Sequence, residues 1–263
     1  MANSVLSSIT RFGLTEPFDL QVARGQITGH KTLFKFGNNS DINGLLESIW
    51  SYGGMYVYPT AAIQMKVSSS NANDTALGTG ARTIVVSGLD ANYNEISETV
   101  TLAGQTVVLT TNTFIRVFRA FVVTAGSSNT AAGTIYVGNG TVTAGVPATV
   151  YAEIPLGENQ TLMAIWTVPA GYTFFVYRGT FSAASNNAAQ YILSKFMFRP
   201  FGGVFRNAAD VTVNSAVVPY DFEIPLALPE KTDIEARAIA LAGTNFYTTA
   251  SFEGIYIRNN GQA

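Results

Sequence analysis

The chain has 263 residues, of which only 12% are Asp, Glu, Lys or Arg, and its formal net charge is −2. A typical soluble domain carries about 25% charged residues, so the surface must consist of Ser, Thr, Asn, Gly and Ala or be covered by other protein. A charge this close to zero disfavours direct nucleic-acid binding, and the absence of cysteine excludes disulfides and thiolate-ligated metals.

The N-terminal part of the chain predicts an arm, residues 1–55, with one short helix. Met1–Leu6 lacks the basic segment and apolar run of a signal peptide, and no run of about 18 apolar residues predicts a membrane span. The helix is predicted over Ser40–Trp50, where apolar residues recur with the 3.6-residue period of one helix face, at Ile42, Leu45, Leu46, Ile49 and Trp50. Ser40 or Asp41 can cap its start, and two glycines, Gly53-Gly54, can end it.

Nearly all of the remaining chain predicts short strands separated by clusters of Gly, Asn, Ser and Thr. The expected strands are Tyr56–Tyr58, Ala62–Ser68, Thr83–Ser87, Ser97–Leu102, Val107–Leu109, Ile115–Val123, Thr134–Val137, Thr149–Ile154, Thr161–Val168, Tyr172–Ser182, Tyr191–Phe198, Val211–Asn214, Phe222–Leu226, Asp233–Ala240 and Tyr247–Ile257. This pattern predicts an all-β protein with one or two antiparallel β-sandwich or jelly-roll-like domains. The composition shift at Gly138–Ala148 places the expected boundary between a first sandwich, residues 56–145, and a second, residues 146–263.

Two of these strands carry charges in an informative pattern. Asp233–Ala238 alternates charged with apolar residues, which predicts a strand with one face in water. Ile115–Val123 is apolar at nearly every position except Arg116 and Arg119, so it is expected to lie deep or between two packed surfaces.

The inventory of catalytic residues is thin, and the chain is not expected to be an enzyme or to need a cofactor. His30 is the single histidine, and no Gly-x-Ser-x-Gly elbow is present. Gly78-Thr79-Gly80 begins like a dinucleotide fingerprint but leads into a strand, so it predicts a tight turn.

Acidic residues suggest two further chemistries, neither of which is favoured. The oxygen side chains of Asp90–Glu95 resemble the start of a calcium loop, but Glu95 stands where the loop needs glycine and Thr101 where it needs a bidentate Glu. An Asx-turn closing a hairpin is the better interpretation, and no metal site is predicted. Carboxylate pairs that could support glycoside hydrolysis are favoured instead as solvated strand faces or salt-bridge partners, namely Glu95 with Glu98, Asp221 with Glu223, and Asp233 with Glu235.

Aromatic clusters point to a core or to subunit contacts rather than to a sugar-binding platform. They comprise Tyr52, Tyr56 and Tyr58, and Phe174, Phe175, Tyr177 and Phe181. The segment Phe196–Arg206 mixes Phe with Lys and Arg, as interfaces do. A capsid or subunit interface is therefore predicted at Trp50, Tyr52, Phe196, Phe198, Arg199, Phe201, Phe205 and Arg206.

The turn and strand motifs resemble structural proteins of tailed bacteriophages, notably marine ones. The resemblance is carried by Ser68–Thr83, Gly88–Glu95, Ser97–Val100, Val168–Thr173 and Glu230–Ile234, and spans roughly residues 45–258. Such proteins are β-rich and often trimeric, and they include capsid cement, neck and tail-attached proteins. These motifs are turn and strand patterns that contain no catalytic residue, so the resemblance supplies none.

The favoured hypothesis is a non-enzymatic cement or decoration subunit that stabilises the capsid lattice. The resemblance then implies a homotrimer, the major capsid protein or other virion proteins as partners, and a place in the virion after assembly in the host cytoplasm. No contact with a membrane is expected. The alternatives are a neck, tail or fibre component with a receptor- or glycan-binding sandwich, a glycan-degrading enzyme, and a cellular sandwich lectin or unrelated assembly protein.

Overall fold

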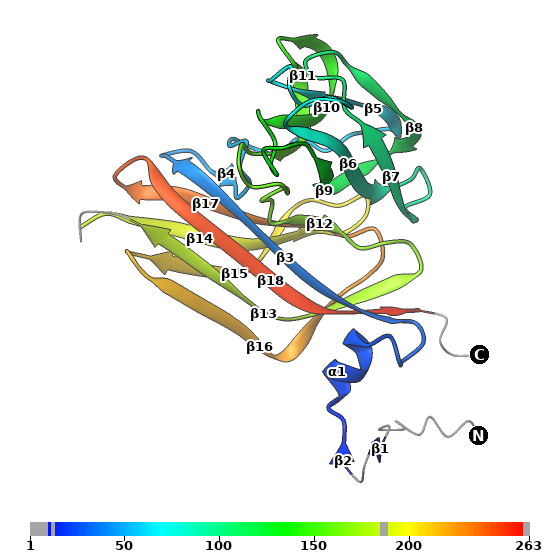
Figure 1. Ribbon diagram of the computed structural model, residues 1–263. Coiled ribbons are helices and arrows are strands. Elements are labelled where there is room, and N and C mark those ends of the chain that lie inside the picture. The colour runs from blue at the N-terminus through cyan, green and yellow to red at the C-terminus, as the bar shows by residue number, and fades with distance from the viewer. Residues whose placement is uncertain (1–9, 12–13, 185–188, 260–263) are drawn as a thin grey trace.

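The computed structural model describes residues 10–11, 14–184 and 189–259, which form strands and one short helix, α1 (Phe18–Ala23). Every strand pair is antiparallel. Most of these strands form two sandwiches, an upper and a lower one (Figure 1). The predicted all-β, antiparallel fold class is confirmed.

The upper sandwich packs a sheet of order β11-β10-β5-β8 on one of order β7-β6-β9. Its strands are β5 (Ile63–Ser69), β6 (Ala81–Leu89), β7 (Glu95–Thr101), β8 (Val108–Phe114), β9 (Arg116–Ala125), β10 (Ile135–Thr143) and β11 (Val146–Ile154). Between the two sheets lies a core that includes Met65, Ile84, Phe114 and Ile135, all fully buried.

The lower sandwich packs a sheet of order β16-β13-β18-β3 on one of order β12-β17-β14-β15, with β4 paired to β17. The bounds are β3 (His30–Ile42), β4 (Glu47–Ser48), β12 (Ile165–Thr167), β13 (Tyr172–Ala184), β14 (Tyr191–Arg199), β15 (Arg206–Val213), β16 (Val217–Leu228), β17 (Asp233–Ala242) and β18 (Phe246–Arg258). Its core is aromatic, with Trp166, Phe174, Phe181, Phe196 and Phe252 almost completely buried. A separate two-stranded piece, β1 (Thr10–Arg11) with β2 (Leu14–Thr15), precedes α1.

The predicted helix over Ser40–Trp50 is wrong. Strand β3 continues to Ile42, and Trp50 forms an isolated bridge with Met163. The helical spacing misleads because the apolar residues serve two cores: Ile42 and Ile49 are buried in the lower one and Trp50 in the upper one, while Leu45 is 76% exposed. The one helix of the described residues lies earlier, at α1.

The strand predictions agree more closely with the structure. Tyr56–Tyr58 is not a strand, but every other predicted strand overlaps an observed one. Strand β3 was not predicted, so the expected arm contributes a long edge strand to the lower sandwich. The Gly138–Ala148 gap is instead the hairpin of β10 and β11, and its turn at Ala144-Gly145, with φ of 49° and 82°, coincides with the expected domain boundary.

The two cores use different segments of the chain. The buried residues of the upper core lie between Trp50 and Ile165, and those of the lower core lie between Ile42 and Ile49 and from Ala164 onward. The expected domain bounds, 1–55, 56–145 and 146–263, stay a prediction.

The stretch Ser68–Thr83 folds around one buried carboxylate, Asp74. Its oxygens accept hydrogen bonds from the backbone N–H groups of Ala81, Ala132 and Gly133 at 2.7, 2.7 and 2.9 Å, and from the Ser69 hydroxyl at 2.6 Å. Nearby, a Cβ on Gly80 would lie 2.2 Å from Asp74 Oδ1, so this turn requires glycine. The Gly78-Thr79-Gly80 motif is thus a tight turn, as predicted.

Asp74→Asn is expected to destabilise the fold by about 2–3 kcal/mol, because an amide nitrogen would face hydrogen-bond donors that the carboxylate now satisfies. Urea unfolding measures this loss. Asp90→Asn is the matched control, since Asp90 accepts its hydrogen bonds in a more exposed turn. Equal stability of the two variants would contradict a central role for Asp74.

Candidate functional site

The charged side chains of strand β17 lie in the interior of the protein rather than in water. Asp233, Glu235 and Arg237 are 3%, 0% and 7% exposed, so the predicted wet face is wrong. The alternate residues Ile234 and Ala236 point into the lower core. Strand β4 pairs with β17 along its edge. The charged face is covered by side chains that include Ser48, Tyr58 and Arg116, so β17 is buried on both faces.

Asp233, in the lower sandwich, binds one arginine from each sandwich. Arg116, from β9, donates from Nε and Nη2 to the two carboxylate oxygens at 2.8 and 3.1 Å. Arg199, from β14, donates to Oδ2 at 2.6 and 3.0 Å. Burial opposes the charge of Arg116, but its hydrogen bonds with Asp233 and their attraction outweigh burial and raise its pKa. The Arg116 guanidinium therefore stays charged in this ion triad.

Glu235 is satisfied as completely as Asp233. It accepts hydrogen bonds from the Ser48 hydroxyl, from the Tyr58 hydroxyl at 3.1 Å and from Arg237 Nη2 at 3.0 Å. Burial, with the negative charge of Glu235, raises the pKa of Tyr58, which keeps its hydroxyl a donor. The pair Asp233 and Glu235 thus acts as a salt-bridge partner, which agrees with the favoured interpretation and leaves neither carboxylate free for glycoside hydrolysis.

Lys35 makes a second link between the lower and the upper sandwich. It is 8% exposed on β3, and its Nζ donates to the backbone oxygen of Phe118 on β9 at 2.5 Å. Burial, with repulsion from Arg119, lowers the pKa of Lys35 to about 7.

A hollow of about 390 Å³ opens beside the Asp233 triad. Its walls include Tyr58, Tyr93, Arg116, Arg199, Phe201 and Asp233. Two guanidinium groups face one carboxylate in this lining, and Lys231 Nζ lies 5.3 Å from the Phe201 ring centre. The junction hollow is therefore positive in a chain whose net charge is negative.

The segment Pro200–Phe205, the junction loop, borders the hollow and exposes apolar side chains. Phe201 is 65% exposed and Val204 71% exposed. The Phe205 ring lies 4.7 Å from the Arg199 guanidinium and 4.1 Å from that of Arg237. Exposed aromatic and aliphatic groups beside arginines are the composition that protein interfaces favour.

The predicted interface residues fall into different environments. Trp50 and Phe196 are 2% and 0% exposed, so they belong to the cores and cannot contact a partner from this conformation. Arg199 is an ion-triad member, and Phe198 and Phe205 are partly buried. Three are exposed, Tyr52, Phe201 and Arg206. The interface itself stays a prediction, now restricted to the junction loop and its flanks.

Other candidate residues have structural roles. Asp90 accepts hydrogen bonds from the backbone N–H groups of Asn92 and Asn94, which confirms the Asx-turn between β6 and β7. His30 Nδ1 lies 3.0 Å from the Thr28 oxygen, with its ring against Phe18. Within the described ranges, no group of three or more His, Cys, Asp or Glu side chains could hold a metal, and no helix is long and apolar enough to cross a membrane.

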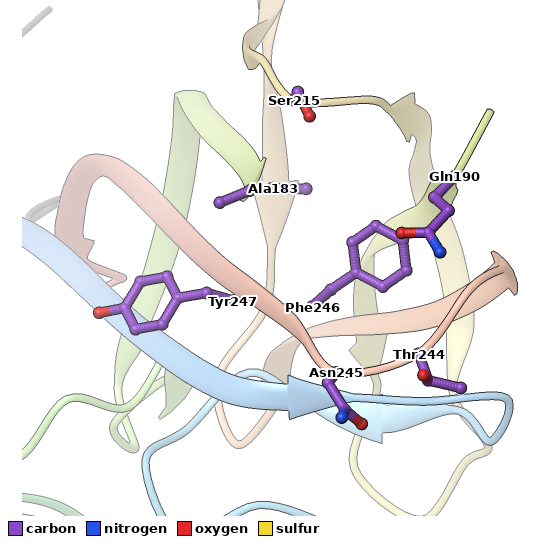
Figure 2. Close-up of a pocket in the computed structure, with 8 residues that line it drawn as sticks. Ala183, Gln190, Ser215, Thr244, Asn245, Phe246 and Tyr247 are labelled. Carbon is purple, nitrogen blue, oxygen red and sulfur yellow. The ribbon is translucent and has the colours of Figure 1, made fainter. Parts of the chain in front are cut away.

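Another hollow, of about 450 Å³, lies at the end of the lower sandwich. Figure 2 shows that it is lined by uncharged side chains, with Phe246 and Tyr247 pointing to opposite sides of β18. Phe246 is 1% exposed and belongs to the core, whereas Tyr247 is 46% exposed.

No protein-family model matches the chain, and no curated protein matches it. Similar solved structures come from infectious bursal disease virus. That of the Gt strain is 10% identical and covers 94% of this chain and 79% of its own, with a TM-score of 0.24. That of the Gx strain is 11% identical, covers 89% and 73%, and has a TM-score of 0.25. The VP2 subviral particle is 10% identical, covers 88% and 73%, and has a TM-score of 0.23. Such low TM-scores do not establish a shared strand arrangement, so function must be inferred from the chain's own residues.

Proposed function

We propose that the chain is a non-enzymatic structural protein of a virus particle, and specifically a cement or decoration subunit on the capsid of a tailed phage. The observation that carries this proposal is the junction loop, where Phe201 and Val204 are exposed beside the positively charged junction hollow. The resemblance of Ser68–Thr83 and the later turn motifs to tailed-phage structural proteins supplies the virion context.

The surface is even less charged than the composition suggests. The junction draws five charged side chains into ion pairs, namely Arg116, Arg199, Asp233, Glu235 and Arg237, out of 15 Lys and Arg and 17 Asp and Glu. Large apolar side chains such as Leu45, Val57 and Ile224 are 76%, 60% and 85% exposed. A surface with few charges and many exposed apolar groups favours a protein that is covered by neighbours in an assembly.

The proposed mechanism is mass action on the assembled shell. A subunit that binds only the assembled lattice stabilises it by RT ln(1 + [L]/Kd) at each site. The Asp233 triad connects the two sandwiches. A subunit that contacts the capsid through both sandwiches therefore resists separation of the capsid proteins beneath it. The positive junction hollow favours an acidic patch on the capsid protein as the contact, and a homotrimer remains the proposed subunit state.

A neck, tail or fibre component with a glycan-binding sandwich is the second candidate. It is favoured by a separate aromatic groove on the lower sandwich, lined by Phe34, Phe36 and Tyr247. Copy number separates the two candidates, because a cement subunit covers the whole shell.

Rebinding to particles that lack the chain tests the junction loop. Purified Phe201→Ala/Val204→Ser is expected to bind such particles at least about 10-fold more weakly than the wild type, because it removes two apolar contacts of about 1.5–3 kcal/mol each when fully buried. Co-sedimentation with the particles measures the affinity, and circular dichroism verifies the fold. Leu77→Ala, at an exposed site on the upper sandwich, is the matched control and should bind normally. Wild-type affinity in the double variant would reject the junction loop as the contact.

A further inference from the structure

The outer face of the β16-β13-β18-β3 sheet carries an exposed aromatic pair that the fold does not explain. Phe34 and Phe36 lie two residues apart on β3 and are 58% and 38% exposed, with ring centres 5.8 Å apart. Helix α1 lies against the His30 end of β3, where Phe18 meets the His30 ring, and leaves this pair uncovered (Figure 1). Two exposed phenylalanines beside a concave surface indicate a ligand.

The groove next to this pair has a volume of about 530 Å³, within the range of small-molecule sites. Phe34 and Phe36 from β3 and Tyr247 from β18 line it, with Leu162 and Glu158 from the segment that follows β11. Tyr247 also borders the hollow of Figure 2.

The floor of the groove is built from neutral hydrogen-bonding groups in register across three strands. Thr180 Oγ1 lies 2.8 Å from Ser251 Oγ. Asn38 Nδ2 donates to the Tyr247 hydroxyl at 2.6 Å, and the hydroxyl of Thr249, which also lines the groove, lies 2.5 Å from that of Ser182. Each hydroxyl has further donor or acceptor capacity beyond the bond that orients it. The groove therefore offers a preformed set of polar groups to a ligand.

We propose that this groove binds a neutral oligosaccharide. The apolar face of a sugar ring packs on an aromatic ring, and its hydroxyls pair with hydroxyl, amide and carboxylate groups, all of which this lining provides. Glu158 is the one charged residue among those lining the groove, and no Lys or Arg is among them, which disfavours phosphates and acidic polymers. This inference rests on the second candidate function, for which it names the ligand class, and it involves a different face of the lower sandwich from the junction loop.

Titration of the isolated chain tests the proposal. Cellohexaose, maltohexaose, mannohexaose and chitohexaose serve as neutral probes, with an oligogalacturonate as the anionic probe, and isothermal calorimetry measures binding. At least one neutral probe is expected to bind saturably at millimolar or lower concentration. That binding should weaken at least 10-fold in Phe36→Ala and also in Thr180→Val, which keeps the side-chain shape and removes the hydroxyl.

Ile224→Ala, at an exposed position on β16, is the control and should leave binding unchanged. The proposal is overturned if no neutral probe binds, if the anionic probe alone binds, or if Phe36→Ala has wild-type affinity. It is also overturned if sedimentation shows self-association that Phe36→Ala abolishes, because a second copy would then occupy the groove. Since this experiment uses no particles, its failure is distinguishable from failure of the capsid proposal.

Discussion

Asp233→Ala is expected to cost about 3–5 kcal/mol of folding stability, because it leaves the Arg116 guanidinium buried without its partner and deprives Arg199 of the same carboxylate. For a chain of this size the loss corresponds to a fall in melting temperature of roughly 6–20 °C. Differential scanning calorimetry measures it. Since Asp233 bonds to residues of both sandwiches, the loss should also make their unfolding less cooperative.

Asp210→Ala is the matched control for this prediction. Asp210 pairs with Lys195 at 3.1 Å, but its side chain is 46% exposed, and exposed ion pairs contribute about 0–1 kcal/mol. Asp210→Ala should therefore unfold nearly as the wild type does. If Asp233→Ala is no less stable than Asp210→Ala, the ion triad does not hold the sandwiches together.

The second large effect concerns Lys35 and pH. Its pKa is about 7 in the folded chain against 10.5 for an ordinary lysine, so between these values the unfolded chain binds more protons. Stability must then rise with pH, and linkage gives a gain of about 3 kcal/mol between pH 7 and pH 9.5. The cost of burying the charge is complete below about pH 7 and is relieved as the pH rises. Urea unfolding across this range measures the slope.

Lys35→Met is expected to remove this rise, because it fills the same space without a charge, although it loses the hydrogen bond to the Phe118 oxygen. Lys66→Met is the control, since Lys66 also donates to a backbone oxygen, that of Gly140 at 2.6 Å, but is only partly buried. Above about pH 10 stability should fall again, because burial raises the pKa of Tyr56, Tyr220 and Tyr256. A stability curve that is flat from pH 7 to 9.5 in the wild type would contradict a lowered pKa for the buried Lys35.

Local sequence patterns predicted the strands well because the alternation of a strand and the residues of a turn depend only on positions that are close together in the sequence. Ile115–Val123 illustrates this: its apolar run predicted a deep strand, and Arg116 and Val117 are 7% and 1% exposed on β9. The alternation of Asp233–Ala238 also predicted a strand correctly. What it could not show was that the charged face lies against another sandwich instead of water.

The errors have a common physical cause, which is contact between segments far apart in the sequence. Ile42 and Trp50 fit one helix face, but they are buried in different cores, so the spacing carried no information about a helix. The partners of Asp233 lie 117 and 34 residues away, at Arg116 and Arg199. The sequence offered one signal for the contact between the two sandwiches, namely the two arginines, Arg116 and Arg119, in the otherwise apolar run of β9. Within Phe196–Arg206, the sequence could not separate the buried Phe196 from the exposed Phe201.

Copy number in purified particles, measured by quantitative mass spectrometry against the major capsid protein, tests the central claim most directly. The cement proposal predicts an abundance comparable to that of the major capsid protein. A few copies per particle would contradict it and favour a neck, tail or fibre position, where the Phe34 and Phe36 groove would become the main functional surface. Absence from particles would contradict any structural role in the virion.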